Sequence, residues 1–348
     1  GIFGDKKGRL SVLFGSIILY SIANFATGYV QTVDQYAACR FFAGLGLAGE
    51  LGAGITLVSE LLPKEKRGIG TSLVAGIGLT GAIVAYFTFK LSGDDWRFSY
   101  KVGGVLGVLL LFLRIKVAES GMYKNIQHQH VQKGNFLMFF TDRKRFLKYI
   151  MAIAIGLPTW FVIGILINQS KAFANEFYAH GKSEIESGRA IMYAYIAIAI
   201  GDVLIGFVSQ YYKSRKKALG LFYILTVITV ALYFSPLNNS DVMMYWICAL
   251  MGFGTGFWAI FVTMGAEQFG TNLRATAATT IPNMVRGSLP LMNMLFLDLF
   301  IKKLGWNFWQ SGVVTGIVVL LVTFIAFYFT EETYHKDLDY LETEQLIP

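Results

Sequence analysis

The sequence predicts an all-α polytopic membrane protein with ten transmembrane helices, and three observations support this fold class. Hydrophobic residues make up 55% of the 348 residues and charged residues only 15%, whereas a soluble domain carries about 25% charged residues. The mean hydropathy is +0.53. Ten apolar runs approach the roughly 20 residues that a helix needs to cross a bilayer. The runs fall near 10–30, 36–59, 69–89, 98–118, 148–170, 190–212, 218–235, 242–264, 276–301 and 308–330.

Lysine and arginine residues concentrate on one side of the predicted membrane. Of the 30, 20 lie in the loops of one side and 8 in those of the other, while Arg40 and Arg286 fall inside runs. Cytoplasmic loops of membrane proteins carry such an excess. The bias therefore places both chain ends and the long connection 119–147 in the cytoplasm. The formal net charge of +8 indicates this topology rather than a nucleic-acid partner.

The chain contains a parallel internal repeat, a feature of many transporter folds. Glu60 and Arg67 recur as Glu267 and Arg274, each at an offset of 207 residues. The basic loop at the N-terminus has a looser counterpart before residue 217, at an offset of about 205. Two apolar runs precede this loop in the second copy and none in the first. The repeat therefore predicts a twelve-helix fold of which this chain holds ten helices, the first two being absent.

Several short motifs lie along the chain at Gly1, Asp5, Lys6, Gly8, Arg9, Arg40, Gly44, Gly46, Gly49, Glu60, Arg67, Trp96, Arg97, Glu119, Ser120, Glu332 and Thr333. In their order and spacing these motifs resemble those of the major facilitator superfamily, including its sugar-porter and organic-ion branches. The resemblance covers essentially the whole chain and implies two six-helix bundles. With the apolar runs, it divides the chain into an incomplete N-terminal bundle at 1–118, a cytoplasmic linker at 119–147, a C-terminal bundle at 148–330 and a cytoplasmic tail at 331–348.

The resemblance also implies a cytoplasmic gate made by charged residues at helix ends. A carboxylate and an arginine there hold neighbouring helices together through charge-assisted hydrogen bonds, which must break when the protein opens. For each residue the alternative is a solvated loop charge that only enforces topology. The gate residues are Asp5, Arg9, Glu60, Arg67, Glu119, Glu267 and Arg274.

Three charged residues lie within about two positions of the midpoints of their runs, and hence near the bilayer centre: Glu50, Asp202 and Arg286. A charge at this depth is costly and marks a functional candidate. Glu50 is the first candidate for proton coupling and Asp202 the second. The alternatives are that Glu50 is a structural partner of Arg40 or another basic group, and that Asp202 pairs with Arg286. Arg286 could instead bind an anionic substrate, because guanidinium suits carboxylate and phosphate.

Other polar and aromatic side chains of the inner helices could line a substrate pathway, although a packing role is an equal alternative for each. The glycines before residue 258 allow close helix approach or bending. Together with Arg286, the substrate-binding candidates are Arg40, Trp160, Asn168, Gln169, Trp258 and Asn283.

These features predict a secondary active transporter that moves a small organic solute by alternating access, with protons as the coupled ion. The alternatives are an uncoupled facilitator and an inactive, truncated fragment of such a transporter. A polytopic enzyme or channel would need a catalytic cluster or filter segment, and the sequence shows neither. We expect no metal, cofactor or nucleic-acid partner, and a monomer in a lipid bilayer. The compact loops favour a bacterial inner membrane.

Overall fold

The computed structural model describes residues 9–62, 67–114, 135–178, 183–336, 340 and 342. Every regular element in these residues is a helix, and each predicted run coincides with one helix or with a helix interrupted along its length. The all-α fold class is therefore confirmed. Eight helical segments in the described part are long and apolar enough to cross a membrane.

The helices of the first half are α2 (Arg9–Thr27), α3 (Val33–Leu61), α4 (Arg67–Leu79), α5 (Gly81–Leu91) and α6 (Trp96–Arg114). Those that follow are α8 (Met138–Thr141), α9 (Arg143–Ala154), α10 (Leu157–Phe161), the π-helix η2 (Val162–Ile167), α11 (Ser170–Phe177), α12 (Ser187–Tyr212), α13 (Arg215–Tyr233), α14 (Asp241–Gly254), α15 (Trp258–Glu267), α16 (Thr271–Gly287), α17 (Leu289–Asn293), the π-helix η3 (Met294–Lys303) and α18 (Phe308–Phe329).

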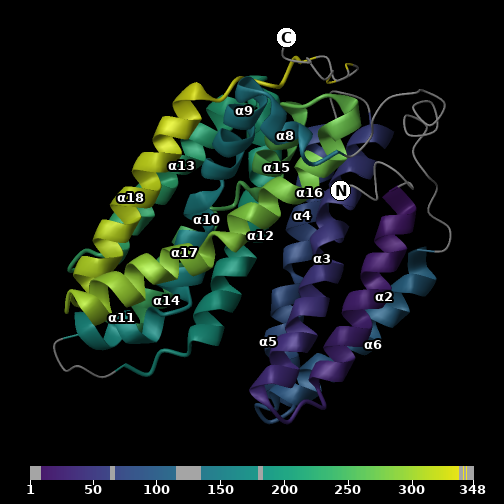
Figure 1. The fold of residues 1–348 in the computed structure, drawn as a ribbon. Helices are drawn as coiled ribbons and strands as arrows, with labels where there is room; N and C mark the ends of the chain where they lie inside the picture. The colour runs from purple at the N-terminus through teal and green to yellow at the C-terminus, as the bar shows by residue number, and fades with distance from the viewer. Residues whose placement is uncertain are drawn as a thin grey trace.

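The helices form two groups that lie side by side (Figure 1). The first group, α2 to α6, is drawn in purple and blue, and the second, α9 to α18, runs from teal to yellow. Three helices of the second group pack against the first group: α12 against α4 and α5, α15 against α4, and α16 against α3. Residues on these helices are therefore positioned to act across the boundary.

The two ends of the bundle differ in what they hold. We call the end that holds α8, the start of α9 and the tail residues 331–336 the linker end, and the opposite end the far end (Figure 1). At the far end, the Tyr86 hydroxyl donates to Glu186 Oε2 at 3.5 Å, and Lys90 Nζ lies 3.5 Å from the same oxygen. These contacts join α5 to the residue before α12.

One interruption lies deep inside the second group, where the chain leaves the helical path between α14 and α15. The close fit of this break against α12 requires glycine: a Cβ added at Gly256 would lie 2.7 Å from the Gly201 Cα and 2.9 Å from the Asp202 backbone nitrogen. The break therefore presses on α12 at Asp202 and starts a new helix, α15, beside it. The glycine-rich stretch before Trp258 thus allows both close approach and bending, as predicted.

The short helix α8 fastens the linker to the second group. Met138 and Phe139 are buried. The Phe139 ring stacks on Tyr149 with 4.5 Å between centroids and meets Phe269 edge-on at 4.9 Å. Because Tyr149 is in α9 and Phe269 follows α15, this aromatic contact ties the linker to two helices of the second group.

Candidate functional site

Arg286 on α16 lies near the boundary between the two groups. Its guanidinium carbon is 5.4 Å from the ring centroid of Trp258, the first residue of α15. Its Nη1 donates to Asn283 Oδ1 at a long 3.4 Å. In the part of the chain that the structure describes, no carboxylate lies within ion-pair distance of Arg286. An arginine inside a membrane helix without a counter-ion is suited to binding an anion.

Two tryptophans form an aromatic wall beside this arginine. Trp160 on α10 meets Trp258 nearly edge-on, with 6.5 Å between ring centroids and an interplanar angle of 75°. The Trp160 indole N–H is buried and donates to no acceptor among the described residues. A buried donor that lacks an acceptor carries a desolvation cost, which a bound solute could remove by accepting the bond. The sequence candidates Trp160, Trp258 and Arg286 are therefore brought together.

Asn283 connects this cluster to the other group of helices. Its amide donates to the Ala48 carbonyl oxygen of α3 at 2.9 Å and to Thr279 in its own helix at 2.7 Å. One turn of helix separates Asn283 from Arg286. The side chain that accepts from Arg286 therefore also bonds across the boundary.

Asp202 lies near the middle of its helix, as its depth in the sequence suggested, but its side chain contacts α15 rather than Arg286. Its side chain is fully buried, and Oδ1 accepts the N–H of Ala259 at 3.0 Å. Oδ2 has no partner within the described ranges. Ala259 is in the first turn of α15, where free N–H groups give a helix its positive end. Asp202 therefore holds the start of α15, and the alternative that it pairs with Arg286 is wrong.

Glu50 lies on α3, two residues beyond Ala48, and is partly buried. The alternative of pairing with Arg40 does not fit this helix. Ten residues of α-helix separate the two Cα atoms by about 15 Å. Arg40 instead donates to Asn24 Oδ1 at 3.1 Å and places its guanidinium carbon 5.3 Å from the Tyr100 ring centroid.

The linker end holds a buried ion pair between α13 and α15. Arg215 donates from Nε and Nη2 to the two carboxylate oxygens of Glu267 at 2.8 and 2.9 Å, and the Thr333 hydroxyl adds a third bond at 2.7 Å. The side chains of Arg215 and Glu267 are 3% and 7% exposed. The predicted gate residue Glu267 is therefore a partner of Arg215 rather than of Arg274.

Glu332 in the tail caps the start of α13. Its carboxylate accepts the Ser214 hydroxyl and the backbone N–H groups of Arg215 at 2.9 Å and Lys216 at 3.1 Å. Burial raises the pKa of Glu332, but these hydrogen bonds, with one from the Tyr334 N–H, outweigh it and lower the pKa below its ordinary value. The stability that Glu332 contributes is therefore present above the ordinary pKa and lost as the pH falls through the lowered one.

Arg274 lies at a second tail contact, in the first turn of α16. It is buried, and its Nη2 lies 3.4 Å from the Thr271 hydroxyl. The Thr271 N–H donates to the Tyr340 carbonyl at 2.8 Å, and the Asn272 amide bonds both the N–H and the carbonyl of Glu342, at 2.9 and 3.0 Å. The tail therefore binds two places on the linker end.

The remaining residues predicted from the sequence either lie away from Arg286 or have side chains outside the described part of the structure. Asn168 is exposed just after η2 and Gln169 precedes α11, two turns beyond Trp160 toward the far end, so the structure does not bring them to Arg286. Asp5 and Glu119 lie outside the described residues. Arg9, Glu60 and Arg67 lie in helices, but only their backbone positions are described.

The sequence did not lead us to predict that Arg215, Glu332 and Thr333 form a hydrogen-bond network with Glu267. One signal was available in the repeat. Arg215 stands 206 residues after Arg9, close to the 207 that separates Glu267 from Glu60. The repeat therefore relates Arg215 and Glu267 to Arg9 and Glu60.

Comparison with known proteins agrees with this architecture. The family model of the Major Facilitator Superfamily matches residues 1–289. The niacin transporter NiaP of Acinetobacter baylyi is 26% identical, over 97% of this chain and 82% of that protein. The sialic acid transporter NanX of Escherichia coli strain K12 is 23% identical, over 82% of this chain and 69% of its own length.

Among solved structures, the proton:xylose symporter XylE bound to 6-bromo-6-deoxy-D-glucose superposes with a TM-score of 0.73. The match covers 97% of this chain and 83% of that chain at 16% sequence identity. At this level of identity the likeness shows a shared fold.

Proposed function

Since this chain belongs to the major facilitator superfamily, a family of membrane transporters rather than enzymes, we propose that it moves a small organic anion across the membrane with protons, by alternating access. The observation that carries the proposal is Arg286: a guanidinium between the two helix groups, stacked on Trp258 and without a carboxylate partner among the described residues. A carboxylate solute would supply the missing counter-ion. The niacin and sialic acid of the two relatives are both acids.

Replacing Arg286 with glutamine is expected to lower the kcat/KM for uptake of an acidic solute by about 10–100-fold, because a hydrogen bond to a charged group contributes about 1.5–3 kcal/mol. The measurement is uptake into proteoliposomes from a panel of radiolabelled organic acids that begins with nicotinate and sialic acid. Lys302→Gln is the matched control, since Lys302 is exposed and, within the described part of the chain, pairs with Asp298 on its own helix. Uptake of a transported acid that is unchanged in Arg286→Gln would contradict the proposal.

For proton coupling, Glu50 remains the first candidate and Asp202 the second. Glu50 is partly buried on α3 next to the segment that Asn283 contacts, so its environment would change as the groups move. Burial favours the protonated form of a carboxyl group and hydration the ionised form. A carboxyl group that alternates between the two environments can therefore take up and release a proton.

Glu50→Gln is expected to abolish uptake driven by a pH gradient while leaving exchange of internal for external solute intact, because only net proton movement needs a titrating group. Both rates are measured in the same proteoliposomes, with Asp202→Asn as the second arm. Loss of the pH-driven component in Asp202→Asn alone would transfer the role to Asp202. Normal pH-driven uptake in both variants would rule out coupling through these two residues.

The linker end is the proposed cytoplasmic gate, and two bundles at 1–118 and 148–330 are the proposed moving bodies. The excess of Lys and Arg in the loops of that end supports a cytoplasmic orientation in a bacterial inner membrane. The Arg215–Glu267 pair and the capping by Glu332 lie within the second body and its tail, so we propose that they hold the linker ends of α13 and α15 in one arrangement beside the gate. The gate proposal extends through the repeat to Arg9 and Glu60.

A further inference from the structure

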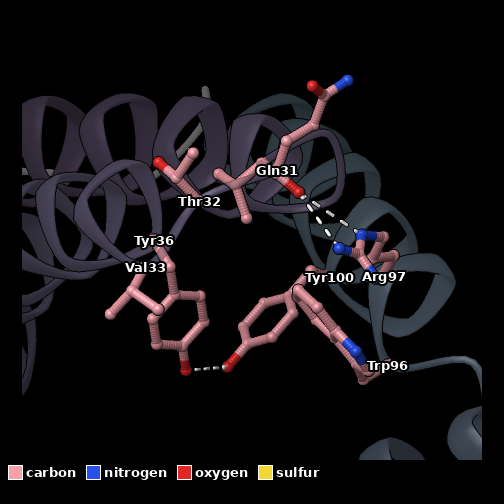
Figure 2. Close-up of a pocket in the computed structure, with 8 residues that line it drawn as sticks. Gln31, Thr32, Val33, Tyr36, Trp96, Arg97 and Tyr100 are labelled. Carbon is pink, nitrogen blue, oxygen red and sulfur yellow. Dashed lines mark hydrogen bonds between the residues drawn. The ribbon is translucent and has the colours of Figure 1, made fainter.

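A hollow of about 460 Å³ opens at the far end of the first helix group. Figure 2 shows the side chains that line it. It lies where the α2–α3 turn meets the first turn of α6. Tyr36 forms part of its wall. Tyr36 lies twelve residues, or about 18 Å of helix, before Ala48, the α3 residue that Asn283 contacts, so the hollow is separate from the Arg286 cluster. The hollow is lined by Val30, Gln31, Thr32, Val33, Tyr36, Trp96, Arg97 and Tyr100.

Three aromatic rings form one wall of this hollow. Tyr36 and Trp96 meet at 6.1 Å and 89°, Trp96 and Tyr100 at 6.0 Å and 86°, and Tyr36 and Tyr100 at 6.4 Å and 75°. The two tyrosine hydroxyls reach toward each other at 3.3 Å (Figure 2). Rings set at right angles offer both faces and edges, which suits a flat aromatic guest. The hydroxyl pair adds a polar group that can donate to that guest.

The charged residue that lines the hollow is Arg97. The Arg97 guanidinium carbon lies 4.2 Å from the Trp96 ring centroid, and its Nε and Nη2 donate to the Val30 carbonyl at 3.4 and 3.2 Å. Among the residues that the structure describes, none accepts a hydrogen bond from Nη1 and no carboxylate pairs with this side chain. Asp95 accepts the backbone N–H of Arg97 instead. No acidic residue lines the hollow.

We propose that this hollow is a second binding site for a planar organic anion, namely an aromatic or heteroaromatic carboxylate. The carboxylate would accept from Arg97, and the ring would pack against Tyr36, Trp96 and Tyr100. An arginine already stacked on an indole is held in place, so binding costs little side-chain freedom. If the chain is the transporter proposed above, this site would receive the solute before Arg286 does. Binding of an aromatic carboxylate at the site does not depend on that function.

Calorimetric titration of the purified chain with benzoate tests the site. The titration is done in the Arg286→Gln background, so that binding at Arg286 does not contribute. Benzoate is expected to bind there, with benzamide and cyclohexanecarboxylate at least about tenfold weaker, because one lacks the charge and the other the aromatic ring. Adding Arg97→Gln or Trp96→Leu is expected to weaken benzoate at least tenfold, whereas adding Lys302→Gln leaves it unchanged.

Arg97→Lys keeps the charge and is expected to retain part of the affinity, and the thermal midpoint of each variant shows whether it is folded. Absence of benzoate binding in the Arg286→Gln background overturns the site, as does binding that neither Arg97→Gln nor Trp96→Leu weakens. The second result would assign the aromatic residues to anchoring at the membrane surface, where tryptophan and tyrosine are common. Loss of all binding in Arg286→Gln leaves the proposed function standing, so the two failures are distinguishable.

Discussion

Replacing Glu267 with alanine is expected to destabilise the protein by about 3–5 kcal/mol, because it leaves the guanidinium of Arg215 buried without its carboxylate. The pair is bidentate, and both side chains are less than a tenth exposed. The measurement is the free energy of unfolding from a denaturing-detergent titration of the purified chain. Replacing both residues by apolar ones, Arg215→Met with Glu267→Leu, is expected to recover much of the loss, since no charge then stays buried.

Glu331→Ala is the matched control for this comparison. Glu331 also carries a carboxylate at the linker end and lies 3.6 Å from Lys148, but its side chain is 62% exposed. Exposed ion pairs contribute about 0–1 kcal/mol. If Glu267→Ala costs no more than Glu331→Ala, the buried pair does not hold α13 to α15 as the geometry indicates.

Two substitutions that remove the charge of Asp202 are expected to differ in their effect on the free energy of unfolding. Asp202→Ala should cost about 1.5–3 kcal/mol, because it leaves the Ala259 N–H in a buried position without an acceptor. Asp202→Asn keeps a carbonyl oxygen in the same place and should cost clearly less. The same unfolding titration measures both, and quenching of tryptophan fluorescence by acrylamide reports whether Trp258 at the start of α15 becomes more accessible in the alanine variant.

The exposed carboxylate of Asp298 provides the comparison for Asp202, since its partner among the described residues is Lys302 on its own helix. Asp298→Ala is expected to change the unfolding free energy by less than about 0.5 kcal/mol. Equal costs for Asp202→Ala and Asp202→Asn would mean that the negative charge, rather than the hydrogen bond to α15, is the stabilising property.

The helical architecture could be predicted because the membrane leaves few choices. A backbone inside hydrocarbon must satisfy its own hydrogen bonds, so an apolar run of about 20 residues becomes a helix. All ten runs did so, and the glycines before Trp258 indicated the bend between α14 and α15. The depth of a residue within its run also follows from counting. For this reason Arg286, Trp160 and Trp258 were selected together, and the structure places them together.

The direction in which a side chain points is harder to derive from a run that is apolar all round. Asp202 and Arg286 share a depth, but Asp202 points to the start of α15 and Arg286 to the Trp258 ring, which only the packing of helices decides. Partners that are distant in sequence were missed for the same reason. Glu267 was matched with Arg274, seven residues on, while its partner Arg215 comes from α13 and Thr333 from the tail.

Helix α15 has a mechanical consequence for the whole chain. In its first turn, the Trp258 ring packs against the Arg286 guanidinium and the Ala259 N–H donates to Asp202. Its last residue, Glu267, accepts from Arg215. Ten helical residues form a rod about 15 Å long. A tilt of about 10° around the end held by Asp202 would move the other end by about 2.5 Å, enough to pull apart hydrogen bonds of 2.8 and 2.9 Å. If a solute bound at Arg286 tilted α15 in this way, the hydrogen bonds between Arg215 and Glu267 at the opposite end of the helix would lengthen.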